Sequence, residues 1–313
     1  MTRDLDVVVL GEALIDIVTT SAGAAERPGG SPANVAVALG RLGREVALVS
    51  RVGRDQRGGT VEQWLSASAV TLHVAGTPDR TATARAVIDE RGDAAYDFDI
   101  DWAVPSPVEI PAARIFHTGS VAATLAPGAD EVRAAAERVR ARALVSYDPN
   151  IRPALTGGVD DARSRVEALV ALSDVVKAST EDARWLYPDV EPVDVARGWV
   201  ARGAGLAVIT DGDAGSLGAT AHAVVEIPAV ATDVVDTVGA GDMFMGTLLD
   251  GILDLPAAGL DDLRAAVRAL DATTLVPLLH RAASAAAITV GREGMDPPTR
   301  EDLQRSAAPK ESA

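Results

Sequence analysis

Short apolar runs alternate with helical patterns along most of this chain, and this alternation limits the folds that it can adopt. Helical patterns such as Ala129 to Ala141 and Asp160 to Leu172 lie between the runs. Alternation of this kind predicts an α/β fold, with a mostly parallel sheet covered by helices. The apolar runs that predict its strands are Leu5 to Leu10, Val46 to Arg51, Ile115 to His117, Leu144 to Asp148, Val175 to Lys177 and Leu206 to Thr210.

Two extended stretches interrupt this rhythm and predict a small second sheet. They are Ala13 to Thr19 and Thr83 to Phe98, the second with a turn at Arg91-Gly92-Asp93. No repeat, heptad run or low-complexity linker marks a domain boundary. We therefore expect one domain over residues 1–313, with a β lid built from about 12–20 and 81–100. The small, polar segment 307–313 predicts a disordered tail.

Composition excludes several classes of function. The chain has 313 residues, 48% of them hydrophobic but 3% aromatic, so its core must consist mainly of Ala, Val, Leu and Ile. The absence of cysteine excludes disulfides, thiolate zinc sites and cysteine nucleophiles, and it fits a reducing cytoplasm. The first apolar run, Val7 to Leu10, is too short for a signal or membrane segment. We expect a soluble cytoplasmic protein with no membrane partner.

The charge of the chain also limits its partners. A net charge of −16 argues against nucleic acid, whose binding needs a basic face. A nucleotide ligand would need Mg²⁺ to offset repulsion. None of the four histidines has the spacing of a metal ligand, so we expect surface or core roles for His73, His117, His222 and His280.

The run from Asp236 to Asp242 predicts an anion site with a carboxylate at its edge. It reads Asp-Thr-Val-Gly-Ala-Gly-Asp, follows an extended stretch from Val224 to Val235 and precedes an apolar helical stretch from Met243 to Leu253. Its small residues let the backbone approach a ligand, and the helix start points N–H groups and a positive dipole end outward. Phosphate suits such a cradle. Asp242 beside it predicts proton transfer from a hydroxyl that attacks the phosphate.

A second segment, from Gly29 to Gly43, predicts a wall for a polar ligand. Ser31 and Pro32 suit a helix N-cap and first helical position, so we expect a helix to begin just after the glycine pair. Asn34 lies at the mouth of that helix and offers both a donor and an acceptor, as a polyol requires. Taken alone, the segment is equally well explained as a glycine turn with a helix cap.

Together, the two segments resemble the signature regions of the ribokinase family, the PfkB-type carbohydrate kinases, and are most similar to those of fructokinases. Three further segments match the family in order and spacing: Gly11 to Asp16, Gly53 to Gly58 and Asp148 to Arg152, which reads D-x-N-x-R. The resemblance implies a ribokinase-like three-layer αβα core with a small β lid. It also implies an ATP-dependent sugar kinase.

By this resemblance, Asp242 is the base that deprotonates a sugar hydroxyl. The amides of Gly239, Ala240 and Gly241 then stabilise the transferring phosphoryl group. The substrate-binding residues that we expect are Asp16, Gly29, Gly30, Asn34, Arg85, Asp148 and Arg152. Asp148 and Arg152 can also be explained as a local ion pair after a strand.

The resemblance also implies a nucleotide site. Thr210 to Gly215 resembles the T-x-G-x-x-G loop of the family, although a plain β-turn explains it too. The nucleotide-binding residues that we expect are Ser179, Thr210, Gly212, Gly215, Thr237, Gly239 and Gly241.

Two acids are candidate metal ligands. The N-x-x-E motif of the family aligns with residues 179–182, where Ser179 replaces Asn and Asp182 replaces Glu. Asp182 would hold Mg²⁺ through water; Glu181 is an alternative, and either can be a plain first-turn acid. Asp236 would help to hold a monovalent cation such as K⁺, together with backbone oxygens of 289–294. A turn former that bonds the local backbone is the other explanation of Asp236.

The sequence favours a neutral sugar. Ribokinases usually carry Lys-Gly where this chain has Ser31-Pro32. This pair is more similar to the corresponding residues of fructokinases and 2-keto-3-deoxygluconate kinases. Acids between Tyr96 and Asp101 would repel a sugar carboxylate unless they face solvent. We expect phosphorylation of an exocyclic hydroxyl of fructose; Arg85 and Arg152 keep an acid sugar as the alternative, followed by ribose.

Two other classes of function explain the sequence less well. A nucleotide-binding oxidoreductase would need the G-x-G-x-x-G spacing, which is missing. A sugar-sensing binding protein without catalysis would explain the changes at Ser179 and Asp182, but not the retained cradle and Asp242. The exposed strand edges of the lid favour a homodimer.

Overall fold

A computed structural model describes residues 5–20, 23–88 and 94–307 of the chain. Its centre is a nine-stranded sheet in the order β13-β12-β11-β10-β9-β8-β1-β4-β5. The seven strands from β11 to β5 in this order run parallel, and β12 and β13 continue the sheet antiparallel. The strands are β1 (Leu5–Leu10), β4 (Val46–Ser50), β5 (Val70–Val74), β8 (Ala113–Gly119), β9 (Leu144–Asp148), β10 (Val175–Ser179), β11 (Leu206–Thr210), β12 (Ser216–Ala219) and β13 (Val224–Ile227).

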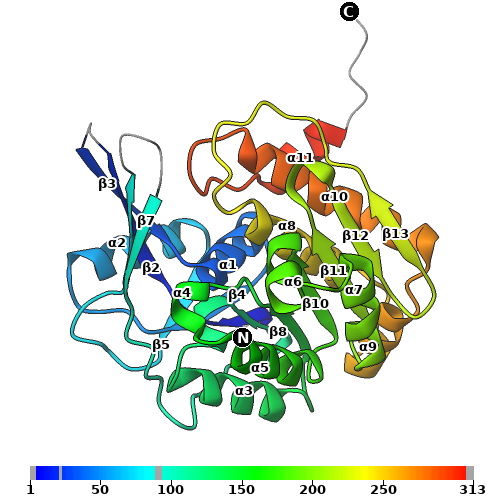
Figure 1. Ribbon diagram of the computed structural model, residues 1–313, viewed down its shortest axis with the longest axis horizontal. Coiled ribbons are helices and arrows are strands. Elements are labelled where there is room, and N and C mark those ends of the chain that lie inside the picture. The colour runs from blue at the N-terminus through cyan, green and yellow to red at the C-terminus, as the bar shows by residue number, and fades with distance from the viewer. Residues whose placement is uncertain (1–4, 21–22, 89–93, 308–313) are drawn as a thin grey trace, which may run out of the picture.

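Helices cover both faces of this sheet, as the alternation predicts (Figure 1). One face packs on α1 (Ser31–Arg41), α2 (Gln56–Ala67), α8 (Ala240–Leu253), α9 (Leu260–Arg268) and α10 (Ala272–Val290). The other packs on α3 (Gly128–Val139), α5 (Val159–Val170), α6 (Thr180–Leu186) and α7 (Pro192–Ala201). Short helices η1 (Ser120–Ala123), α4 (Pro153–Thr156) and η2 (Gly212–Ala214), and the last helix α11 (Arg300–Ala307), complete the fold. The predicted three-layer αβα architecture is confirmed.

A separate four-stranded sheet forms the lid and projects from one side of the main body (Figure 1). Its order is β3-β2-β6-β7, from β2 (Leu14–Thr20), β3 (Gly23–Gly29), β6 (Thr83–Ile88) and β7 (Ala94–Asp99). The sequence does not predict β3, because its exposed residues, GAAERPG, lack an apolar face. The expected turn at Arg91-Gly92-Asp93 lies outside the described residues.

Two element boundaries differ from the sequence prediction. The extended stretch from Val224 to Val235 is a strand only as far as Ile227, because Pro228 lacks the N–H that would continue the ladder. Helix α1 begins one residue earlier than expected, with Gly30 as its N-cap. The expected disordered tail 307–313 overlaps the structure only at Ala307, the end of α11; residues 308–313 lie outside the described part.

The parallel strands bring the predicted site segments to one edge of the sheet. Strands β1, β9, β10 and β11 all end there, so the residues that follow them gather at the same place even though they are far apart in sequence. Helix α8 packs on α1 and on α10, which carries the Asp236 to Asp242 run to this edge as well.

Within the described ranges, no helix has the length and apolar character needed to cross a membrane.

Candidate active site

A cavity of about 1040 Å³ lies between the lid and the carboxyl edge of the main sheet. Its lining comes from lid strands β2, β3, β6 and β7, from the start of α1 and from the start of α8. The charged groups that line it are Glu12, Asp16, Arg27, Arg152, Asp236 and Asp242. Segments near residues 16, 30, 152 and 240 thus meet around one space, as the sequence predicts.

The predicted anion cradle lies at the first turn of α8. Gly239 is its N-cap and has a left-handed φ of 76°. A Cβ at this position would lie 2.1 Å from Sδ of Met295, so both the backbone and the available space require glycine. The first amides of an α-helix have no partner inside the helix. In α8 the Ala240 amide donates a long bond of 3.4 Å to the Thr237 oxygen, and the amides of Gly241 and Asp242 that follow it suit a phosphate oxygen.

Asp242 is held from two sides by the start of α1. The Ser31 hydroxyl donates to its Oδ1 at 2.6 Å, and Nδ2 of Asn34 donates to its Oδ2 at 2.8 Å. The carboxylate is buried, with the residue 8% exposed, yet it lines the cavity. This contact explains why Ser31 is not the N-cap: its hydroxyl bonds Asp242 instead of the helix backbone. Two fixed donors orient the carboxylate and leave lone pairs for a substrate hydroxyl.

Asp16 and Arg152 lie in the same cavity as Asp242. Burial raises the pKa of Asp16 to about 6; the positive charge of Arg152 opposes this rise and the negative charge of Asp242 adds to it. Nη1 of Arg152 donates to Oδ1 of Asn150 at 2.7 Å, which anchors the guanidinium to its own turn. Arg152 therefore supplies a fixed positive charge close to Asp16.

The predicted glycine pair allows close packing beneath these groups. A Cβ at Gly29 would lie 2.0 Å from Oδ2 of Asp16. Gly30 has a φ of 101°, and a Cβ there would lie 2.7 Å from the backbone oxygen of Glu12. Both positions line the cavity, so the pair forms the wall that the sequence predicts.

Arg85 is the one expected substrate residue that lies on the outer face of the lid. Its neighbours Ala84 and Ala86 line the cavity, and Arg85 itself is exposed, because successive residues of a strand point to opposite faces. The same alternation places Phe98 in the cavity wall and leaves Asp97 and Asp99 exposed. Those acids therefore face away from the cavity.

Four of the expected nucleotide residues lie at or just after the ends of β10 and β11, outside the cavity lining: Ser179, Thr210, Gly212 and Gly215. Thr210 donates to the Ala178 oxygen at 3.3 Å. Gly212 and Gly215 have φ values of 50° and 108°, and a Cβ at Gly215 would lie 2.1 Å from the Ile227 oxygen. Their glycines shape this loop. Thr237, by contrast, is exposed and lines the cavity beside the cradle.

Ser179 and Asp182 form a capping box at the start of α6. The Ser179 hydroxyl accepts from the Asp182 amide at 3.0 Å, and Oδ2 of Asp182 accepts from the Ser179 amide at 3.1 Å. Oδ1 of Asp182 accepts from the Ile151 amide at 2.7 Å. Both carboxylate oxygens therefore already hold backbone donors, as in the first-turn acid explanation.

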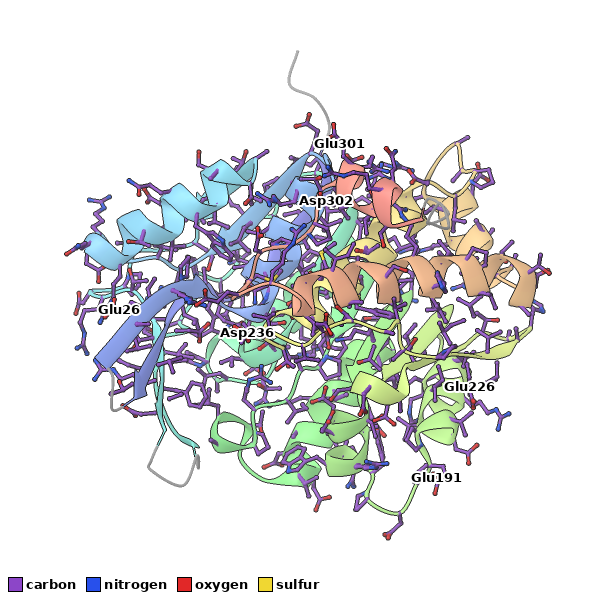
Figure 2. The ribbon with its side chains drawn as sticks, turned by 90° about the horizontal axis from the view of Figure 1, so that it is seen from above. Glu26, Glu191, Glu226, Asp236, Glu301 and Asp302 are labelled. Atoms are coloured by element: carbon purple, nitrogen blue, oxygen red, sulfur yellow. The ribbon has the colours of Figure 1, made fainter. Side chains whose placement is uncertain are left out.

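Asp236 connects the cradle to the loop after α10. Its Oδ1 accepts from the Val238 amide at 3.0 Å and its Oδ2 from the Gly294 amide at 2.9 Å. Nη1 of Arg27, from lid strand β3, lies 4.0 Å from Oδ2. In Figure 2, Asp236 lies near the middle of the molecule, and Glu26 lies farther out on the lid. The sequence analysis expects backbone oxygens of 289–294 beside Asp236. The structure instead joins Asp236 to this segment through the Gly294 amide.

Three contributors to this region are missing from the sequence prediction. Glu12 lines the cavity, and burial raises its pKa to about 7 against the hydrogen bonds from Ser120 and the Ala122 amide. Lys177 is buried and donates to Oδ2 of Asp148 at 2.8 Å. A lysine inside an apolar strand is a usable signal, because fully buried lysines are rare unless paired. Arg27 has no such signal, since β3 itself is not predicted.

Known carbohydrate kinases are similar to this chain in sequence and in structure. The profile of the pfkB family carbohydrate kinases matches residues 4–302. A fructokinase of Klebsiella pneumoniae is 32% identical over 311 residues, which cover 95% of this chain and 98% of that protein. The structure of a Xylella fastidiosa fructokinase with bound ATP has a TM-score of 0.81 at 26% identity, covering 96% of this chain and 97% of that one. A Vibrio cholerae O395 fructokinase, solved with fructose, ADP and potassium ion, has a TM-score of 0.81 at 26% identity, covering 97% and 99%.

Proposed function

This chain belongs to the pfkB family of carbohydrate kinases, and we propose that it transfers the γ-phosphoryl group of ATP to an exocyclic hydroxyl of a neutral sugar, fructose first. One observation carries the proposal: Asp242 lines the cavity at the start of α8, fixed by Ser31 and Asn34. A carboxylate so placed suits proton removal from a hydroxyl that attacks a phosphate on the adjacent amides.

The transfer is direct and in line. The sugar oxygen forms its bond to the γ-phosphorus while the bond from that phosphorus to the ADP oxygen breaks, and the hydroxyl proton passes to Asp242. The first-turn amides of α8, from Gly239 to Asp242, stabilise the charge on the transferring group. Closure of the lid over the cavity excludes water, which would otherwise accept the phosphoryl group.

The charges around the cavity support a neutral sugar. Arg152 already offsets the charge of Asp16, and Arg27 is paired with Glu293 and close to Asp236. Glu12, Asp16 and Asp242 provide acceptors for several hydroxyls. A substrate carboxylate would need an additional cation.

A sugar acid such as 2-keto-3-deoxygluconate is the second candidate, and one observation favours it. The exposed side chains of Asp97 and Asp99 face away from the cavity, so they do not repel a substrate carboxylate. Arg152 is the cavity residue that would bind that carboxylate.

Mg²⁺ fits this site as an ion brought mainly by the nucleotide. Among the described residues, no three acids or histidines cluster in the manner of a complete metal site. Both oxygens of Asp182 are in use, so we assign Asp182, with Glu181 beside it, to the water shell of the ion. When bound, Mg²⁺ neutralises charge on the transferring phosphates.

The Asp236 carboxylate fits a monovalent cation poorly. Both of its oxygens accept backbone amides, and the Arg27 guanidinium lies within ion-pair range. A dependence on K⁺ would therefore rest on backbone carbonyls of 289–294.

The proposal is tested by ATP turnover over a sugar panel. Fructose, 2-keto-3-deoxygluconate, ribose and nucleosides should be compared by kcat/KM, and fructose should rank first. A preference for the acid sugar would overturn the choice of a neutral substrate. Tight sugar binding without turnover of any member would favour a sugar-sensing protein instead.

Substitution of the base provides the second test. Asp242→Asn should lower kcat for the best sugar by roughly 100- to 10,000-fold, because general-base catalysis contributes about that much. Asp254→Asn, at the exposed end of the same helix, is the matched control and should leave kcat near wild type. A folded Asp242→Asn protein with wild-type turnover would contradict the assignment.

A further inference from the structure

A buried ion pair lies directly below the anion cradle. Lys177 occupies the middle of β10, and its side chain is 5% exposed. Its Nζ donates to Oδ2 of Asp148, the last residue of neighbouring strand β9, and the Asp148 side chain is 1% exposed. Both groups lie outside the cavity lining, although the sequence predicts Asp148 as a substrate-binding residue.

The position of the ammonium is unusual for a structural ion pair. A Cβ built on Gly241 would lie 3.0 Å from Nζ of Lys177, so the ammonium sits against the first turn of α8. The start of a helix carries positive partial charge, and a cation placed there is disfavoured. Such a placement is favourable only where negative charge gathers at the same point. It also explains why the cradle has a glycine at 241.

Negative charge does gather there. Burial opposes the charged form of Lys177, but Asp148, Asp242 and Asp182 outweigh it and hold its pKa above the usual value. Burial raises the pKa of Asp148 to about 6, against the attraction of Lys177. Asp16 adds a further charge near Asp242, offset by Arg152. A triphosphate would add several more.

The pair is also incompletely satisfied. The bond to Asp148 uses one of three N–H donors, and no second acceptor is found for Lys177 among the residues that the structure describes. In the same part of the chain, the buried Oδ1 of Asp148 has no hydrogen-bond partner. Replacing a buried ion pair by apolar groups is often neutral or stabilising, so stability alone does not account for this one.

We propose that Lys177 is a positioning residue for phosphoryl transfer, which keeps a positive charge beneath the first turn of α8 where the Asp242 carboxylate and the transferred phosphoryl group meet. This inference rests on the proposed function. The charge lowers the electrostatic repulsion between the Asp242 carboxylate and the incoming phosphate. Lys177 acts through the α8 backbone and through space, without touching the sugar.

The test compares Asp148→Asn with the double variant Lys177→Met and Asp148→Asn. Lys177→Met alone would leave Asp148 buried and unpaired, so the double variant isolates the lysine charge in a fold without that acid. With the best sugar of the panel, the double variant should have a kcat about 10-fold or more below Asp148→Asn. The KM for that sugar should match the KM of Asp148→Asn, because Lys177 lies outside the cavity lining.

A second, largely buried pair at the start of β10 provides the matched control. Arg264 bonds both oxygens of Asp174, which precedes the strand at the opposite edge of the sheet. Asp174→Asn with Arg264→Met removes the same charges at a distance from the cradle, so its kcat should stay near wild type. A double variant at 148 and 177 with the same kcat as Asp148→Asn, or with a kcat loss matched by an equal rise in the sugar KM, would overturn the inference. Absence of wild-type turnover with every sugar would instead overturn the proposed function, and the inference with it.

Discussion

Three carboxylates of the cavity have different surroundings. Asp242 accepts two side-chain hydrogen bonds, from Ser31 and Asn34. Burial raises the pKa of Asp16 to about 6, and burial raises that of Glu12 to about 7. At neutral pH, Asp16 is therefore mostly ionised and able to accept hydroxyl protons in hydrogen bonds, whereas Glu12 is partly protonated. Residues of the same type thus receive different roles from their neighbours.

Glu12 predicts a pH-dependent contribution to stability. Between its reference pKa of 4.5 and its folded value of about 7, the folded protein holds a proton that the unfolded chain has lost. The free energy of unfolding therefore falls as pH rises through this window, by up to about 3 kcal/mol from this group. Glu12→Gln removes that dependence and keeps an oxygen for the Ala122 amide.

The measurement is urea unfolding of wild type and Glu12→Gln from pH 5 to pH 8. The variant should gain stability relative to wild type as pH rises. A constant difference between the two proteins across this range would show that Glu12 does not titrate there.

Among the elements, β3 joins the lid to the phosphate end of the site. Its Arg27 forms an ion pair with Glu293 and lies 4.0 Å from Asp236, and Arg27 and Asp236 both line the cavity. The preceding residue of β3, Glu26, pairs with Arg57 of α2 and so connects the lid to the main body. One strand therefore connects the lid to the loop after α10 and to the main body. β3 and β7 are also the edges through which a homodimer would form, which remains a prediction.

Loss of the Arg27 contact should loosen lid closure. Arg27→Ala should raise the sugar KM by about fivefold, the equivalent of about 1 kcal/mol for a partly exposed ion pair. It should also increase ATP hydrolysis without sugar transfer, because an open lid admits water. Both rates can be measured by coupled assay of ADP and of sugar phosphate. Arg57→Ala removes the ion pair with Glu26 and is the control; equal effects of the two variants would refute a specific role for Arg27.

For the whole molecule, Asp250 of α8 joins parts that are distant in sequence. Its fully buried carboxylate pairs with Arg44 before β4, Arg281 of α10 and Arg300 of α11. Removing Asp250 would leave Arg44 and Arg281 with the half-exposed Asp254 in place of a fully buried acid, and would cost several charge-assisted hydrogen bonds at once. The network therefore holds the helices behind the cradle in place.

Asp250→Ala should lower the free energy of unfolding by about 3 to 5 kcal/mol. The loss is measured by denaturant unfolding at constant pH and salt. Asp254→Asn, whose side chain is 51% exposed, is the control and should cost about 1 kcal/mol or less. A loss for Asp250→Ala no larger than for the control would contradict the role of this network.

Much of the architecture is predictable from local sequence. Every one of the six apolar runs became a strand of the main sheet, because a strand buried on both faces must be apolar. β3 is not predictable, since an exposed lid strand has no such requirement. The sequence predicts the start of α1 one residue too late. The reason is that the Ser31 hydroxyl bonds Asp242, more than 200 residues away, and no local pattern contains this contact.

By itself, the sequence determined the family, the αβα fold and the chemistry of the phosphate cradle, because glycine positions, strand composition and the Asp242 carboxylate are local properties. Tertiary structure alone decided which side chains face the cavity. It directed Arg85 outward, brought Glu12 and Arg27 inward and placed Lys177 beneath Gly241. The physical reason is that burial and electrostatic interaction depend on distance in space, and the folded sheet brings residues into contact that are far apart along the chain.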